Sequence, residues 1–161
     1  MRNPFTPAEH AAWGGFLGTF GRMSAQIDAD LRDRYGLSHV EFEVLLRLAL
    51  SQDGRLRIQD LAERSILTRS GMSRAVERLE RAALVSKARA VEDRRGAYAV
   101  LTDAGRDLFE RAAAEHVAFV RARFLALFTE DELEQMAGFW QRVARSGSGD
   151  EAAADRTKGS A

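Results

Sequence analysis

The sequence has no cysteine among its 161 residues. This absence excludes disulfide bonds, thiolate metal sites, iron–sulfur clusters and every regulatory switch that depends on thiol oxidation. The chain also lacks an apolar run of about 18 residues, the length that a membrane-spanning helix needs. Its N-terminus is not a basic and then apolar leader. The sequence therefore predicts a protein that stays in the cytoplasm.

Motifs typical of enzymes are missing as well. The chain has no glycine-rich phosphate loop, no G-x-S-x-G turn and no H-E-x-x-H helix. Its three histidines are scattered, at His10, His39 and His116. His39 with Glu41, and Glu115 with His116, would form a metal site only if the helices that carry them touched. The sequence predicts no enzyme and no cofactor, and it leaves a zinc-responsive protein as an alternative.

The chain has no net charge, but its charged residues are unevenly distributed. The whole chain is neutral, with 45% hydrophobic and 30% charged residues, which is ordinary for a soluble globular protein. Between Arg55 and Arg95, however, eleven lysines and arginines accompany six acidic residues, and the rest of the chain carries the opposite imbalance. Scattered surface charge is the simpler explanation. A local positive excess also favours contact with a phosphate backbone.

The first third of the chain predicts two helices. Thr6-Pro7-Ala8-Glu9 and Ser38 with Glu41 are capping boxes, and Gly36 is a natural stop between the two helices. The first helix would run to Tyr35 and the second to about Leu50, with Val44, Leu45 and Leu48 facing inward. The apolar side of the first helix repeats every 3.6 residues, at Trp13, Phe16, Phe20, Met23, Ile27, Leu31 and Tyr35.

The middle of the chain predicts a helix, a turn, a second helix and a hairpin. Residues 58–65 suit a short helix, and residues 68–82 a longer one, buried through Met72, Val76 and Leu79. Two short apolar strands, residues 84–90 and 97–101, flank a charged tip at residues 92–96. This order is typical of a winged helix-turn-helix, in which a helix reads one groove of DNA and a hairpin another.

The last third predicts two more helices and a tail. Thr102 would cap a helix that continues through Phe128, and the capping box Thr129–Glu132 would open a final helix that ends near Arg145. The small and polar residues 146–161 predict a disordered tail. The expected fold class is therefore mainly α with a small β-hairpin wing. Its expected parts are residues 1–36 and 103–145 for dimerisation and residues 37–102 for DNA binding.

In these motifs the chain resembles the MarR family of bacterial transcriptional regulators, from about residue 8 to residue 144. The resemblance rests on Leu61-Ala62-Glu63-Arg64, Ser70, Ser73, Arg78-Leu79-Glu80, Leu84-Val85, Asp93-Arg94-Arg95 and Leu101-Thr102-Asp103-Ala104-Gly105. It implies a homodimer that straddles a pseudo-palindromic operator and a small-molecule cleft beside the DNA-binding lobe. Ala83 and Ile66 stand where such sequences commonly have glycine. If position 83 is left-handed, its alanine costs about 1 kcal/mol.

The candidate DNA contacts lie on the second helix of the motif and on the hairpin tip. They are Arg69, Ser70, Ser73, Arg74, Arg78, Asp93, Arg94 and Arg95. Of these, Arg69 and Arg74 with the two serines would meet bases or nearby phosphates, and Arg78 would clamp a phosphate. Arg95 would enter the minor groove, with Asp93 fixing an arginine rotamer. A solvated hairpin tip is the alternative for the last three residues.

A candidate effector site is expected beside the first helix. Trp13, Phe16, Phe20 and Phe42 would line it, with Arg47 as partner of a carboxylate, although an aromatic stripe on an amphipathic helix can also be core. The predicted function is a homodimeric repressor that a small aromatic or anionic ligand releases from DNA. One alternative is a zinc-responsive regulator of the same fold. A second is a winged-helix protein-interaction module, and salt dependence separates it from DNA binding.

Overall fold

The computed structural model describes residues 4–63, 65, 68–89 and 97–158, with residues 147–158 described by their backbone alone. The chain forms two compact units, residues 1–116 and 117–161. In order along the chain, the elements are α1 (Pro7–Tyr35), α2 (His39–Leu50), β1 (Arg55–Arg57), α3 (Ile58–Glu63), α4 (Arg69–Arg81), β2 (Val85–Arg89), β3 (Ala97–Leu101), α5 (Asp103–Arg123), a 3₁₀ turn (Leu125–Leu127) and α6 (Glu130–Lys158). No helix in these described ranges is long and apolar enough to cross a membrane.

The predicted helix starts are confirmed by their hydrogen bonds. The side chains of Thr6 and Ser38 each accept from the backbone N–H of the glutamate three residues on, and that glutamate accepts from the cap. Thr129 and Glu132 make the same reciprocal pair at the start of α6. These bonds satisfy backbone donors that the first turn of a helix leaves free. Short-range sequence patterns therefore fixed where these helices begin.

The sheet has three strands rather than the two expected. The strand order is β1-β3-β2, and both pairings are antiparallel. The missed strand, β1, has only three residues, and its Arg-Leu-Arg sequence pairs with residues more than forty positions further on. Ahead of it, the Gly54 carbonyl accepts from the Leu101 N–H at 2.8 Å. A strand this short is stabilised by its partner, so its own sequence gives little sign of it.

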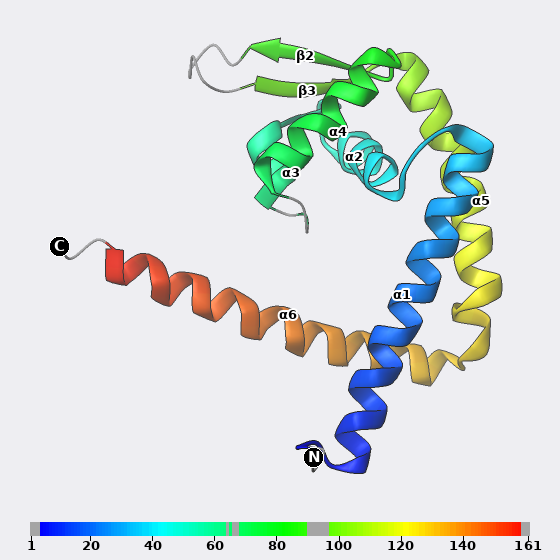
Figure 1. Cartoon of the computed structure of the whole chain (residues 1–161), viewed down its shortest axis with the longest axis vertical. Coiled ribbons are helices and arrows are strands. Elements are labelled where there is room, and N and C mark those ends of the chain that lie inside the picture. The colour runs from blue at the N-terminus through cyan, green and yellow to red at the C-terminus, as the bar shows by residue number, and fades with distance from the viewer. Residues whose placement is uncertain (1–3, 64, 66–67, 90–96, 159–161) are drawn as a thin grey trace. The chain divides into compact units, whose positions relative to one another are not determined.

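The core of the winged lobe lies between α2, α3, α4 and the sheet (Figure 1). The predicted inward side chains of α2 and α4 are buried, as are Leu61, Ala62, Val85 and Ala99. The first helix behaves differently. Only Ile27 and Leu31 in its C-terminal part are fully buried, while Trp13 and Phe20 are 53% and 55% exposed. The apolar stripe of α1 is therefore only partly used within this chain.

The end of α4 and the start of α5 are joined through their backbones. Ala83 has φ 57°, and the N–H groups of Ala83 and Leu84 bond to the carbonyls of Glu80 and Leu79, which is a Schellman cap. The Thr102 hydroxyl donates to the Ala83 carbonyl at 2.8 Å and accepts from the Gly105 N–H at 3.0 Å. The position occupied by Ala83 is thus left-handed, the conformation in which alanine is disfavoured.

Two predicted boundaries in the last third differ from the structure. The helix opened by Thr102 ends at Arg123 and is followed by a 3₁₀ turn, where the rings of Phe124 and Phe128 meet edge to face at 5.2 Å. No glycine or proline marks this break. The helical spacing of the apolar residues therefore predicted one continuous helix. The backbone of α6 continues to Lys158, whereas a disordered tail was expected from residue 146. A segment without apolar residues to bury can still form a helix when it contains alanines and charged residues of high helix propensity.

Candidate nucleic-acid interface

Helix α4 has one buried face and one basic face. Its N-cap is Thr68, whose side chain accepts from the Gly71 N–H at 3.2 Å. Met72, Ala75, Val76 and Leu79 are buried against the lobe. The candidate contact residues Arg69, Ser70 and Arg74 are exposed, and Ser73 is half-buried. The helix is thus held through its apolar side while its polar side remains open to solvent.

The N-terminal half of this basic face carries charge that no described acidic side chain neutralises. Within the described residues, Arg69 and Arg74 form no ion pair, and the first turn of α4 contains no acidic side chain. The helix macrodipole adds partial positive charge at the same end. The Ser70 hydroxyl is 3.1 Å from that of Thr68. This end of α4 therefore offers cations and hydroxyl groups suited to phosphates and base edges.

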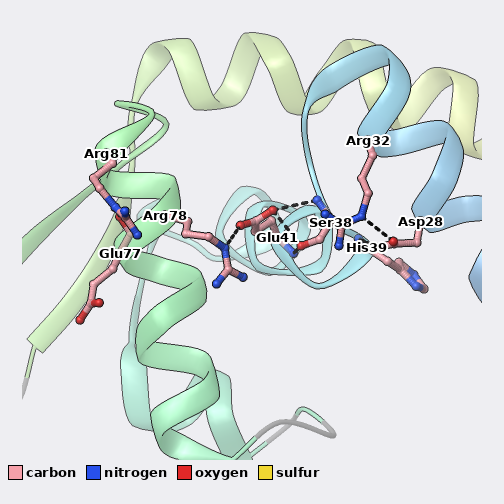
Figure 2. Close-up of polar contacts among 8 residues, drawn as sticks. All are labelled: Asp28, Arg32, Ser38, His39, Glu41, Glu77, Arg78 and Arg81. Atoms are coloured by element: carbon pink, nitrogen blue, oxygen red, sulfur yellow. Dashed lines mark hydrogen bonds and ion pairs between the residues drawn. The ribbon is translucent and has the colours of Figure 1, made fainter.

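Arg78 lies in a different environment from Arg74. Its Nε donates to the Glu41 carboxylate at 2.5 Å, so it is bound to the start of α2 (Figure 2). Burial pushes the pKa of Glu41 up, but hydrogen bonds from the Ser38 backbone and from Arg78 hold that pKa below its ordinary value. Glu41 is therefore an ionised, nearly buried partner of Arg78, a role that was not predicted from the sequence.

Two other basic residues near α4, Arg81 and Lys87, bond to groups of this helix. Arg81 Nε donates to the Glu77 carbonyl at 3.2 Å. Lys87 of β2 is 3.0 Å from the Glu80 carboxylate and 3.9 Å from that of Glu77. The Lys87 contacts fasten the hairpin to α4 and reduce the charge available at the C-terminal half of this helix.

The hairpin tip lies outside the described residues, and with it the candidates Asp93, Arg94 and Arg95. Two further arginines, which the sequence analysis did not select, lie on the sheet itself. The guanidinium groups of Arg55 and Arg57 are each 5.3 Å from the centre of the Tyr98 ring, and Arg57 Nε donates to the Tyr98 hydroxyl at 3.3 Å. The alternation of Arg-Leu-Arg places both arginines on the same face of β1, and this period of two was the available signal.

In the described part of the chain, the five candidate effector-site residues lie in separate places. Trp13, Phe16 and Phe20 form a row along α1, with ring centres 5.7 Å and 6.1 Å apart. Phe42 is buried against Phe109 and His116, as core. The carboxylate of Glu43 lies 3.9 Å from Arg47 on the same helix.

A cavity of about 260 Å³ lies instead where the end of α1 meets α2 and α4. It is lined by Arg32, Tyr35, Gly36, Leu37, Glu41, Arg78, Leu79, Ala82 and Leu84. The wall combines two guanidinium groups and a phenol with leucine side chains. None of the five sequence candidates lines this cavity.

The possible metal ligands are not assembled. The Glu41 carboxylate is bound to Ser38 and Arg78, and that of Glu115 is 2.6 Å from Arg34. Burial and nearby His39 lower the pKa of His116, whose buried Nδ1 has no hydrogen-bond partner among the described residues. No group of three or more histidine, aspartate or glutamate side chains comes together as a metal site in the described part of the chain. Two of the four possible ligands, Glu41 and Glu115, are therefore engaged by arginines.

The helix pair α3–α4 and the adjoining three-stranded sheet define a winged helix-turn-helix protein. The chain is 31% identical to AbsC, a MarR family transcriptional regulator from Streptomyces coelicolor, with a TM-score of 0.84 over 92% of this chain and 99% of that one. Its TM-score is also 0.84, at 30% identity and 91% of both chains, with Sco3205 of the same organism, a MarR family regulator crystallised in complex with DNA. It shares 30% identity with the HTH-type transcriptional repressor MdtR of Bacillus subtilis, over 74% of this chain and 75% of that one. The MarR family profile matches residues 35–96. This chain belongs to the MarR family.

Proposed function

We propose that the protein is a homodimeric, sequence-specific DNA-binding repressor that acts in the cytoplasm. The observation that carries the proposal is the free basic end of α4, where Arg69 and Arg74 have no ion-pair partner among the described residues. The similarity to Sco3205, whose structure was determined with DNA, supports DNA binding. The named relatives are also transcriptional regulators or repressors.

Each part of the interface has a distinct task in this proposal. Arg74 and Arg69, with the hydroxyls of Ser70 and Ser73, meet base edges and adjacent phosphates in the major groove. Arg95 at the wing tip enters the minor groove, where a narrow A·T-rich segment focuses negative potential. Arg95→Ala should therefore lower affinity and weaken the preference for A·T-rich flanks, as measured by titrating operators with altered flanks.

Dimerisation is supported by apolar side chains that the chain leaves exposed. On α1 they are Trp13, Phe16, Leu17 and Phe20, and on α6 they are Phe139, Trp140 and Val143. An isolated monomer gains nothing from exposing such a group of large apolar side chains, whereas an obligate dimer interface buries about 2,000 Å² or more of core-like surface. A second copy of the chain would cover them and hold two α4 helices at the spacing of a pseudo-palindrome.

The corner cavity supports a small anionic or aromatic effector. Arg32 and Arg78 supply guanidinium N–H donors, although each is already paired with a carboxylate (Asp28 and Glu41), and Leu37, Leu79 and Leu84 supply an apolar wall. Such a ligand would lower DNA affinity only to the extent that it binds the DNA-incompetent arrangement more tightly. Aromatic carboxylates and phenols of this size are the compounds to screen, by their effect on melting temperature and on operator release.

The test of the main proposal is selection of binding sites from random DNA duplexes, followed by affinity titration of the enriched sequence. The proposal expects a pseudo-palindromic motif and an affinity that falls steeply with added salt, because each neutralised phosphate releases counterions. Failure to enrich any duplex would contradict DNA binding. If a protein partner were then captured with little salt dependence, the interaction-module alternative would replace the proposal.

A further inference from the structure

Glu41 uses its two carboxylate oxygens for two different helices. One oxygen, Oε2, accepts from the backbone N–H and the hydroxyl of Ser38, both at 2.8 Å, and so caps α2. The other, Oε1, accepts from Arg78 Nε of α4 at 2.5 Å. Figure 2 draws these bonds at the point where α4 passes the start of α2. The residue thus joins the cap of one helix to the side of another.

Two other glutamates of the chain can be compared with Glu41. Glu9 and Glu132 occupy the same position in the capping boxes of α1 and α6. Both are exposed, and in the described part of the chain neither binds a side chain of another helix. The side chain of Glu41 is only 9% exposed, while that of its partner Arg78 is 50% exposed. Capping alone does not require a buried carboxylate, so the second contact of Glu41 needs its own explanation.

The start of α2, which carries Glu41, is bonded to α1 through Asp28. Asp28 accepts from Arg32 Nε at 2.7 Å and from the backbone N–H of His39 at 2.8 Å, across the corner between α1 and α2. The bond from Arg32 and then the bond from His39 hold the pKa of Asp28 below its ordinary value, so this carboxylate is also ionised at neutral pH. Arg78 is therefore bonded to the junction of α1 and α2, which the carboxylates of Glu41 and Asp28 stabilise.

From this geometry we propose that Glu41 is a positioning residue for DNA recognition. It holds Arg78, and through it the third turn of α4, in the orientation that presents Arg74 and Arg69 to the operator. The inference rests on the proposed DNA binding, and it gives Arg78 a different role from that of a phosphate clamp. Removing the Glu41 charge leaves the half-exposed Arg78 without the partner that fixes its side chain, which favours a shift of the third turn of α4.

Positioning and simple electrostatics predict opposite changes in DNA affinity for the substitution Glu41→Gln. Glu41→Gln keeps an oxygen that can accept from Ser38 but removes the charge that binds Arg78. It also makes the protein one unit more positive, so electrostatic attraction alone predicts tighter DNA binding. Positioning predicts the opposite, a loss of affinity for the selected operator of about tenfold.

Glu43→Gln is the matched control. It makes the same change of charge two residues along the same helix, where the carboxylate is exposed and lies near Arg47 of α2 itself. This variant should bind the operator as tightly as the wild type or slightly more tightly. Measuring both variants well below their melting temperatures keeps the comparison independent of any loss of stability.

Arg78→Gln provides a second route if Glu41→Gln does not fold, because Arg78 is half-exposed. Positioning predicts weaker binding with an unchanged slope of log affinity against log salt, whereas loss of a phosphate clamp reduces that slope by about one. The double variant Glu41→Gln/Arg78→Gln should bind no more weakly than the weaker single variant, since both remove one contact.

The outcomes are distinct. Weaker binding by Glu41→Gln, with Glu43→Gln unaffected, supports the inference. Wild-type or tighter binding by a folded Glu41→Gln overturns it, as does a salt slope reduced by one in Arg78→Gln. A wild-type protein that binds no duplex would overturn the proposed function instead.

Discussion

The winged lobe and the first half of α1 use apolar side chains in opposite ways. The lobe buries Leu45, Leu48, Met72 and Leu79 almost completely within one chain, whereas α1 exposes Trp13 and Phe20 over more than half of their surfaces. Both stretches are equally regular at the level of sequence. The lobe thus completes its own core, while the N-terminal half of α1 leaves large apolar side chains exposed, which the proposed dimer contact would cover.

The largest expected effect comes from breaking that contact. The double variant Trp13→Glu/Phe20→Glu places two charges in the proposed dimer interface and should convert the protein to a monomer of 17.9 kDa. Light scattering would measure the mass, and the wild type should have twice this value. A monomeric wild type would contradict the explanation given for the exposed aromatic row.

A substitution inside the lobe should act on stability instead. A Cβ at Gly105 would lie 2.0 Å from the Leu84 carbonyl oxygen, a backbone atom that cannot move aside cheaply. Gly105→Ala should therefore lower the free energy of unfolding by about 1–3 kcal/mol, as measured by urea denaturation. Gly21→Ala in the exposed half of α1, where a Cβ would have no neighbour within 4 Å, is the control and should not destabilise the chain. Equal effects at both positions would remove the distinction between the two regions.

The two left-handed helix ends give a smaller and sharper comparison. Gly36 and Ala83 have φ values of 67° and 57°, but only the first is glycine. Ala83→Gly should raise the free energy of unfolding by about 1 kcal/mol, and Gly36→Ala should lower it by a similar amount. Thermal melting of both variants checks the prediction. A stabilising Gly36→Ala would contradict it.

The smallest expected effect concerns pH and the half-buried His116. Burial, with His39 nearby, lowers the pKa of His116 below 6.5, so the unfolded chain takes up this proton more readily than the folded one. The associated stability is complete above about pH 7 and is lost as pH falls through 6.5 towards the folded pKa. His116→Phe should flatten the pH dependence of unfolding between pH 7.5 and 5.5, whereas the exposed variant His10→Gln should keep it. No change in that dependence for His116→Phe would be the contrary result.

The sequence predicted best what depends on neighbours along the chain. The capping boxes at Thr6, Ser38 and Thr129 and the inward residues of α4 follow from spacings of three or four residues. Strand β1 and the Glu41–Arg78 bond depend on partners that lie about forty residues away, so no local pattern contains them. The corner cavity was not foreseen for the same reason, since it forms where α1, α2 and α4 meet.

The central claim is that α4 reads DNA through its free basic end, and Arg74→Ala tests it most directly. On the selected operator and on its single-base variants, the substitution should cost about 1–3 kcal/mol of binding free energy and relax base preference at one position in each half-site. Arg81→Ala, at the other end of the same helix, is the matched control and should retain the base preference. A folded Arg74→Ala protein with wild-type affinity and unchanged preference at every position would contradict the account.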